Sequence, residues 1–575
     1  MTGLITTGIF PRFNIRVTAA AMNEPRSESA LVVDPRNPNR LLGASKHFYD
    51  PQKYTFSLSA VFSEDGGDTW EDLPAFPIPV NHIIYTDPSA TFGTPSAPGM
   101  ASPAWVMGDP GFSKFPIIDG PNLFELFECA AHGQTDDILT SQMLAQQSID
   151  DGATWTEHEI VALRCTGDDK GWIACDNSTL TTGKPKPKPL SPYHGRLYAV
   201  WAAETPMRFA RSLDGGKTWI GAGSAKAGDN IGLQATEGPD ISISRNGTVH
   251  LFAHRPDTFG IDYQWSADGG ETFQGATFVA NSIGDIHKNI DNQNIKWAGS
   301  PGSAKWPVFD GANFRVITLV SSCCFGDAGI MIAWADARSK HSRIFYRLSY
   351  DNGATWQGDP SGTPLLPDLN DDSHQFHPQL AVTGNGVIGC AMYSYSKTAR
   401  PGNKPGIDVL VAGSFDQGTT WELKTVTEQP WDPAVNAPWS HGDSKVTFIG
   451  EYFGFDAGAK QFHVLWTDTR DGNQDLYYCR VDTENYNSPV KDIVAEIEAT
   501  LVSPGVPRGG DGFVVVNGHV IRVPPHEPLR PVLDAVVAIK TASEIGRLDT
   551  TRATQALCDV MINAAKLAKR DLTSK

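Results

Sequence analysis

One eight-residue pattern, Ser-x-Asp-x-Gly-x-Thr-Trp, occurs six times in this 575-residue chain and constrains its fold more than any other feature. The copies are SEDGGDTW (63–70), SIDDGATW (148–155), SLDGGKTW (212–219), SADGGETF (266–273), SYDNGATW (349–356) and SFDQGTTW (414–421). A single copy carries little information. Six copies with one conservative change, Phe273 for Trp, indicate tandem repeats of one structural unit.

The chemistry of the pattern is that of a tight turn between antiparallel strands. The Asp carboxylate can accept hydrogen bonds from N–H groups of the turn, Gly adopts backbone angles that other residues avoid, and the final aromatic residue anchors the returning strand. Alternating segments such as SLSAVF and RIFYRLSY lead into the copies. We therefore interpret the six aspartates as structural rather than catalytic: Asp65, Asp150, Asp214, Asp268, Asp351 and Asp416.

Composition agrees with a chain of short strands and argues against several classes of protein. The sequence has 55 Gly, 40 Pro and 15 Trp but only 19% charged residues, which favours turn-rich β-structure over coiled coil or disorder. Its 47 basic and 65 acidic residues give a net charge of −18 without any basic run, so we expect no nucleic-acid partner. No segment approaches about 18 consecutive apolar residues, so we also expect no membrane span.

The pattern is the Asp-box, or BNR, repeat, and the chain resembles the sialidase-like β-propeller superfamily over roughly residues 5–485. Other phrases are similar to strands of BNR-repeat proteins: SALVVDPRNPNRLLGAS, DKGWIACD, GRLYAVW, FIGEYFGF and WTDTRDGNQDLYY. The resemblance implies an all-β propeller of four-stranded antiparallel blades around a central channel.

The spacing of the boxes predicts the number of blades. Successive box aspartates between Asp65 and Asp416 lie about 70 residues apart, so some 480 residues would hold nearly seven blades. After the last box, VTFIGEYFGF, FHVLWTDTR and DLYYCRVD are expected to form three further strands, and FNIRV near the N-terminus could supply the fourth and close the ring. We therefore predict seven blades, with six, the number in true sialidases, as the alternative.

The pattern changes beyond about residue 485, which predicts a propeller domain of residues 1–485 and a small α/β domain of residues 486–575. Helical spacing occurs in 489–501, 527–545 and 550–572, and GFVVVNGHVIRV predicts a hairpin with Asn517-Gly518 at its turn. We expect this appendage to pack on the propeller, on a second copy of the chain in a homo-oligomer, or on an assembly partner.

The order of strands within a blade indicates where a ligand would bind. The box joins strands three and four, so the opposite edge carries the start of strand one and the end of strand two. The resemblance implies that ligands bind at this edge, at the mouth of the channel. Candidates for catalysis there are Glu451, Tyr452, Glu237 and Asp169. Candidates for substrate contact are Arg255, Arg338, Arg470, Trp334, Trp466 and His377.

Several of these residues also have a structural interpretation. WADAR and WTDTR form a repeated pair, so we favour ion pairs that stabilise the blades, Asp336–Arg338 and Asp468–Arg470, over substrate contacts. Glu451-Tyr452 lies in a phrase common to BNR proteins and is equally consistent with a structural role. A divalent cation could bind at Asp371, Asp372, His374 and His377, but we favour a solvated acidic loop and predict no resident metal or cofactor.

The chain departs from true sialidases near its N-terminus. Those enzymes carry a Phe/Tyr-Arg-Ile-Pro element, whereas the nearest phrase here is FPRFNIR, residues 10–16, so Arg12 and Arg16 are not equated with the sialidase arginine. We expect a glycosidase of the superfamily that acts on a glycan through paired carboxylates or a Tyr/Glu pair. The alternative is a non-catalytic propeller that binds a glycan or protein and docks to an assembly through residues 486–575. A polysaccharide lyase with a metal at the His374/His377 loop is a third hypothesis.

Cysteine content and the N-terminus bear on the compartment. Eight cysteines are too few for a disulfide scaffold, and buried thiols are favoured, although Cys165 and Cys175 could form a bridge and Cys323 and Cys324 are adjacent. The N-terminal segment MTGLITTGIFPRFNIRV shows no basic region followed by an apolar one. We therefore expect a protein that is extracellular or particle-associated after non-Sec export rather than cytoplasmic.

Overall fold

The computed structural model describes residues 4–18, 24–78, 82–96, 100–113, 141–164, 168–178, 191–203, 206–234, 238–255, 260–282, 284, 286, 295–367, 369, 371–487, 512–516 and 519–523. The chain divides into two compact units, Asn14–Val481 and the pair of segments Met1–Phe13 and Asp482–Lys575. The helices expected at 489–501, 527–545 and 550–572, and the Asn517-Gly518 turn, lie outside the described residues. In the described part of the chain no helix is long and apolar enough to cross a bilayer.

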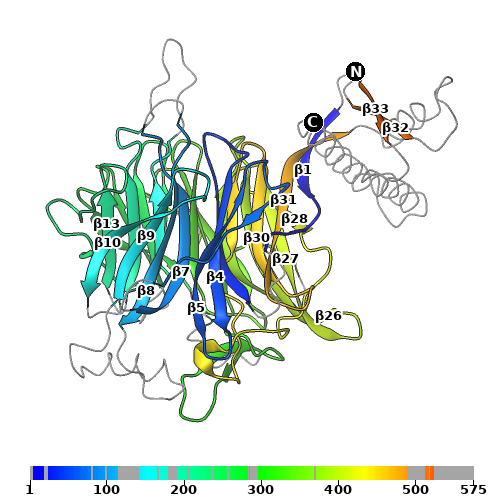
Figure 1. The fold of residues 1–575 in the computed structure, drawn as a ribbon. Helices are drawn as coiled ribbons and strands as arrows, with labels where there is room; N and C mark the ends of the chain where they lie inside the picture. The colour runs from blue at the N-terminus through cyan, green and yellow to red at the C-terminus, as the bar shows by residue number, and fades with distance from the viewer. Residues whose placement is uncertain are drawn as a thin grey trace. The chain divides into compact units, whose positions relative to one another are not determined.

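In the described part of the larger unit, seven antiparallel sheets form the blades of a propeller (Figure 1). Blade 1 contains β3 (Arg26–Val33), β4 (Leu41–Asp50), β5 (Thr55–Ser63) and β6 (Glu71–Asp72). Blade 2 contains β7 (His82–Phe92), β8 (Ala104–Ser113), β9 (Ser141–Ser148) and β10 (Thr156–Arg164). Blade 3 contains β11 (Asp168–Cys175), β12 (Leu197–Ala203), β13 (Pro206–Ser212) and β14 (Asp229–Gln234). Blade 4 contains β15 (Asp240–Ile243), β16 (Val249–His254), β17 (Gly260–Ser266) and β18 (Gln274–Asn281).

The remaining blades repeat this arrangement. Blade 5 contains β21 (Val320–Phe325), β22 (Gly329–Asp336), β23 (Arg343–Ser349) and β24 (Thr363–Pro364). Blade 6 contains β25 (His374–Val382), β26 (Ile388–Arg400), β27 (Lys404–Ser414) and β28 (Glu422–Thr425). Blade 7 contains β29 (Gly454–Ala457), β30 (Gln461–Asp468), β31 (Asp475–Asn487) and β2 (Ile15–Arg16). A separate hairpin of β19 (Ile295–Ala298) and β20 (Trp306–Phe309) precedes blade 5.

The first strands of the blades form a closed ring. Each contacts the next in the order β3, β7, β11, β15, β21, β25 and β29, and β29 contacts β3 again. Blade 7 is completed from the N-terminus, because Ile15 pairs with Tyr478 and Arg16 with Tyr477. The predictions of seven blades and of closure by FNIRV are therefore confirmed. One difference is that the first strand of blade 7 begins only at Gly454, well inside the phrase VTFIGEYFGF.

Each Asp-box forms the turn between the third and fourth strands of its blade. In the third copy, Asp214 accepts hydrogen bonds from Ser212 Oγ (2.9 Å), Thr218 N (2.9 Å) and Thr218 Oγ1 (2.7 Å). Gly216 N donates to Ser212 Oγ at 2.8 Å. The turn thus closes its own hydrogen bonds within eight residues, and this local completeness explains why the same pattern recurs in six blades.

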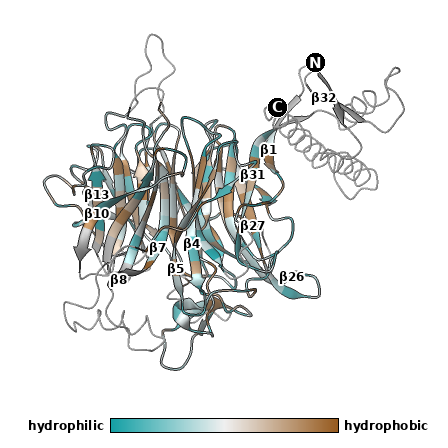
Figure 2. Ribbon diagram, in the orientation of Figure 1, coloured by the Kyte–Doolittle hydropathy of each residue, from teal (hydrophilic) through white to brown (hydrophobic). Residues whose placement is uncertain are grey.

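The glycine at the fifth position of each box also lies close to a side chain of the preceding blade in the copies described next. Gly216 has a φ of 87°, and a Cβ added to it would lie 2.1 Å from the ring of Trp105 in blade 2. Gly270, Gly353 and Gly67 meet Phe209, Tyr263 and Tyr478 of the preceding blades in the same way. Between the blades, apolar strand residues form the core, and Figure 2 shows them as brown stretches along the strands.

The smaller unit contributes few described elements. β1 (Leu4–Pro11) pairs with β31, and Arg12 Nε lies 2.6 Å from Asp482 Oδ2. β32 (Gly512–Val516) and β33 (His519–Val523) form an antiparallel hairpin, as the alternation in GFVVVNGHVIRV predicts.

Candidate functional site

Four inner strands carry the same irregularity near their starts. In β3, β7, β11 and β25 the pairing register shifts, and one non-glycine residue inside the shift has a positive φ. These residues are Glu28 (φ 50°), Asp87 (φ 51°), Lys170 (φ 48°) and His377 (φ 49°). A β-bulge of this kind redirects a side chain, and left-handed backbone costs a non-glycine residue about 1–3 kcal/mol. Strain repeated in four blades points to a functional constraint at the channel mouth.

Charged side chains meet at these bulges in one group, which we call the channel cluster. It contains Glu28, Lys46, Asp87, Asp109, Asp169, Lys170, Arg315 and Glu451. All are buried except Asp169, whose side chain is 44% exposed.

Ion pairs connect the members of the cluster across blades. Lys46 pairs with Glu28, and its Nζ lies 3.2 Å from Asp87 Oδ1. Lys170 Nζ lies 2.5 Å from Glu451 Oε2, and Arg315 Nε lies 2.9 Å from Glu451 Oε1. The two glutamates are joined directly, because Glu451 N donates to Glu28 Oε1 at 3.3 Å.

Burial and the neighbouring charges drive the pKa values of the acidic residues apart. Burial alone would raise the pKa of Glu451, but the charges of Arg315 and Lys170 outweigh it and lower that pKa to about 2. Burial raises the pKa of Glu28 to about 7 despite the opposing charge of Lys46. Burial, together with the charges of Asp87 and Asp169, raises the pKa of Asp109 well above its usual range. Separated values of this kind are typical of sites that handle protons, although ion-pair networks also produce them.

A cap covers part of the cluster. It consists of the β19–β20 hairpin and the short helix η1 (Ser440–Gly442). The helix η1 is drawn in yellow at the lower end of the propeller in Figure 1. The His441 ring stacks on Trp306 (centroids 5.2 Å apart) and on Tyr54 (5.0 Å), and the Arg315 guanidinium lies 4.4 Å from the Trp306 ring. Asp443 accepts hydrogen bonds from Ser300 and Ser303 and so links the two parts of the cap.

The structure brings some of the predicted site residues together. Glu451 and Asp169 belong to the channel cluster, and His377 is buried at the fourth bulge. Tyr452 is buried beside them, but its hydroxyl donates to Pro88 O at 3.3 Å and burial raises its pKa well above the usual range, which does not suit a nucleophile. Glu237 lies outside the described residues.

The predicted substrate-contact residues lie elsewhere, at the ends of second strands. Arg255, Arg338 and Arg470 form ion pairs with Asp262, Asp336 and Asp468. Trp334 and Trp466 are fully buried, and their indole N–H groups donate to the same two aspartates, Asp336 and Asp468. Their rings therefore offer no face to a sugar, and WADAR and WTDTR stabilise their blades, as the structural interpretation of the repeated pair predicts.

Sequence reasoning did not select most of the channel cluster. A usable signal was present, because each bulge residue precedes a residue that is small or proline: Glu28-Ser29, Asp87-Pro88, Lys170-Gly171 and His377-Pro378. Arg315 and Asp109 carry no such signal. Arg315 enters from the segment after the β19–β20 hairpin, and Asp109 lies on β8 opposite Thr86.

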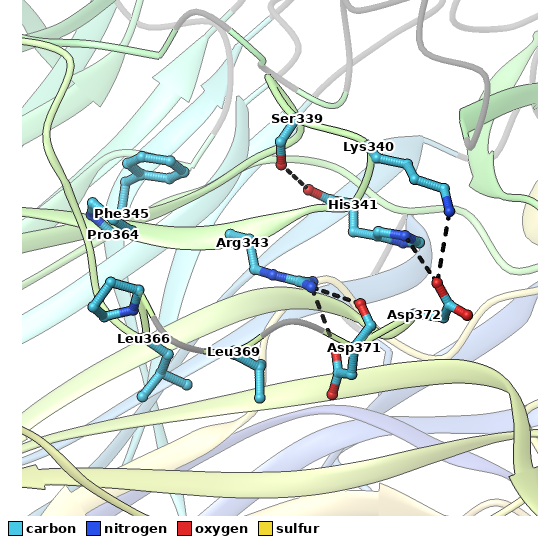
Figure 3. A pocket seen from close by; sticks show the side chains of 11 residues that line it. Ser339, Lys340, His341, Arg343, Phe345, Pro364, Leu366, Leu369, Asp371 and Asp372 are labelled. Atoms are coloured by element: carbon cyan, nitrogen blue, oxygen red, sulfur yellow. Dashed lines mark hydrogen bonds and ion pairs between the residues drawn. The ribbon is translucent and has the colours of Figure 1, made fainter.

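The acidic loop that could bind a cation contributes Asp371 and Asp372 to the lining of a surface pocket of about 470 Å³ (Figure 3). Asp371 pairs with Arg343, and Asp372 pairs with Lys340 and His341. The His374 ring instead stacks on Phe309, with centroids 4.2 Å apart. Among the described residues, the group whose ligand atoms lie within reach of one ion is Asp87, Asp109 and Asp169.

None of the cysteines that the structure describes belongs to the channel cluster. Cys175, Cys323, Cys324, Cys390 and Cys479 are free thiols, as the buried-thiol interpretation predicts, and Cys165 lies outside the described residues.

The ring of inner strands, the box turns and the strand order define a β-propeller with seven blades. No family model matches the chain, and no curated protein matches it. Among solved structures, a protein of unknown function from Dyadobacter fermentans is 10% identical, with 83% of this chain and 99% of that chain covered at a TM-score of 0.41. The NanB sialidase of Streptococcus pneumoniae is 12% identical, with 66% of each chain covered at a TM-score of 0.39. An α-L-arabinanase of Penicillium chrysogenum is 13% identical, with 50% of this chain and 90% of that chain covered at a TM-score of 0.28.

Proposed function

We propose that this propeller hydrolyses a glycosidic bond at the channel cluster. The observation that carries the proposal is the meeting of two buried glutamates, Glu28 and Glu451, from neighbouring blades among three cationic side chains. Glycoside hydrolysis needs two carboxyl groups beside the scissile bond, one ionised and one that carries a proton. The cluster offers both groups at the edge of the propeller opposite the Asp-boxes.

The ion pairs assign different roles to the two glutamates. Lys170 and Arg315 both pair with Glu451, so Glu451 stays ionised and acts as the nucleophile or as the base that activates water. Glu28 is then the carboxyl group that donates a proton to the leaving oxygen. Lys46, Lys170 and Arg315 supply hydrogen-bond donors for the oxygens of the substrate.

Access to the cluster sets a condition on the reaction. Because the Trp306 ring lies over Arg315 and the His441 ring stacks on Trp306, we expect the cap to move aside when a glycan enters. The half-exposed Asp169 lies on the side of the cluster that already faces solution, so we expect the substrate to approach from there.

The test is hydrolysis of a glycan panel by the wild-type protein and by Glu451→Gln and Glu28→Gln. We expect each substitution to lower kcat/KM by about 10²–10⁴-fold, the usual contribution of a general acid or base. Asp371→Asn, on the exposed loop of Figure 3, is the matched control and should retain wild-type activity. Absence of turnover by the wild-type protein on every glycan would eliminate the proposal.

A propeller that binds a glycan without cleaving it is the second candidate. The burial of Glu28, Lys46, Asp87, Lys170 and Glu451 favours it, because buried ion pairs also serve to rigidify a channel. In that case a glycan would bind at the propeller, as calorimetry can detect, and would be released unchanged.

A further inference from the structure

Three carboxyl groups converge on one side of the channel cluster. Asp87 lies at the bulge of β7, and Asp109 lies on the adjacent strand β8 opposite Thr86. Asp169 is the second residue of β11, the inner strand of the next blade. One carboxylate oxygen from each lies within 4.8 Å of the others. Like charges this close repel strongly when they are withdrawn from water, so the arrangement needs compensation.

Among the described residues, Lys46 and Lys170 form ion pairs with Asp87 and Asp169, whereas Asp109 forms none. Lys46 is shared between Glu28 and Asp87, and Lys170 is shared between Glu451 and Asp169. Asp109 is only 3% exposed, and its Oδ1 has no hydrogen-bond partner among the residues that the structure describes. A buried carboxyl group with an unpartnered oxygen, in a group that has one oxygen within 4.8 Å of those of two other carboxyl groups, is an environment expected of a metal ligand.

We propose that Asp87, Asp109 and Asp169 bind one divalent cation of the calcium type. The three ligands are all carboxylates, with no imidazole or thiolate among them, which favours a hard cation over zinc or copper. Calcium holds oxygen ligands at about 2.3–2.6 Å, and one ion can reach three oxygens that lie within 4.8 Å of one another. Magnesium demands near-ideal octahedral geometry at about 2.0–2.1 Å and gives up its water reluctantly, so we expect it to bind more weakly here.

The side chains around the three carboxyl groups determine how tightly we expect the cation to bind and how it reaches the site. Each carboxylate has two oxygens, so Asp87 can keep Lys46 on one and bind the ion with the other. Asp169 is half-exposed, which opens the site to solution and leaves room for water to complete the coordination shell. Because two ammonium groups lie nearby, we expect weak binding, with a dissociation constant of roughly 10⁻⁵–10⁻³ M.

This site goes beyond the proposed hydrolysis, and its test requires no glycan. The full chain is stripped with EDTA, dialysed, and titrated with CaCl₂ and separately with MgCl₂ by calorimetry. We expect one calcium site, weaker magnesium binding, and a higher melting temperature in calcium than in EDTA. Asp109→Asn should weaken calcium binding about tenfold or more, since it removes one of three charged ligands. Asp372→Asn, on the exposed loop, is the matched control and should bind calcium as the wild type does.

Three results would overturn the proposal: no calcium binding up to about 10 mM, wild-type affinity in Asp109→Asn, or tighter binding of magnesium than of calcium. Should Asp109→Asn fail to fold, Asp169→Asn is the substitute, because its half-exposed side chain tolerates the change. The difference in melting temperature between calcium and EDTA then still tests the wild-type site directly.

Discussion

Replacing Gly216 by alanine tests how an Asp-box holds neighbouring blades together. Gly216 has a φ of 87°, and its added Cβ would lie 2.1 Å from the fully buried ring of Trp105. Gly386 has almost the same backbone angle, φ 89°, but a Cβ there meets nothing within 4 Å. Gly386→Ala therefore measures the backbone cost alone, about 1–2 kcal/mol. Gly216→Ala adds the cost of overpacking, about 1–3 kcal/mol more.

The assay is urea unfolding of both variants and the wild type, followed by tryptophan fluorescence. With equal m-values, the shift in midpoint gives the change in the free energy of unfolding. We expect Gly216→Ala to lose about 1–3 kcal/mol more than Gly386→Ala. Equal losses would refute the reasoning, because the contact between the box glycine and the preceding blade would then contribute nothing measurable.

Three further predictions concern the charged and capping residues. Burial raises the pKa of Glu451, but the charges of Arg315 and Lys170 outweigh it and lower this pKa from its ordinary value of 4.5 to about 2. The ionised carboxylate therefore stabilises the fold above pH 4.5, and this contribution is lost as the pH falls toward 2. Glu451→Gln should flatten the melting temperature between those pH values, and an unchanged acid profile would contradict this. Asp351→Ala removes the acceptor of Thr355 N (2.8 Å) and Thr355 Oγ1 (2.6 Å), and urea unfolding should show a loss of about 1–2 kcal/mol, since the freed groups can turn to water. Asp443→Ala should speed hydrogen exchange in residues 299–306, because Ser300 and Ser303 lose their common acceptor, whereas unchanged exchange would exclude Asp443 as the link within the cap.

The fold was largely predictable because its repeating unit is local. Ser212, Asp214, Gly216 and Thr218 complete their hydrogen bonds within one turn, so the sequence of a box specifies a strand, a turn and a returning strand without help from distant residues. The closing strand was also predictable, since three strands are expected after the last box and the segment around Ile15, which pairs with Tyr478, has the alternation to supply the fourth.

The candidate site was predictable only in part. Glu451 and Asp169 were selected because they lie at the expected starts of first strands, and the structure pairs both with Lys170. At second-strand ends, Asp336 and Asp468 bind the polar groups of the arginines and tryptophans of their own blades. Contact of the arginines with a substrate stays a prediction. Alternation along a strand shows which residues face inward but not which of them a partner has already neutralised.

The sequence by itself indicated four-stranded blades, seven of them with six as the alternative, because each box turn and the strands beside it are formed by residues close in the chain. Only the tertiary structure decided which charges meet. Glu28 and Glu451 are 423 residues apart yet joined by a hydrogen bond, since closing the ring brings blade 7 against blade 1. The channel cluster forms from residues that are far apart in the sequence. Ring closure, the four strained bulges and the cap over Arg315 bring these acidic and basic residues together. The physical reason is that the energy of a buried charge depends on its neighbours in space, which local sequence does not specify.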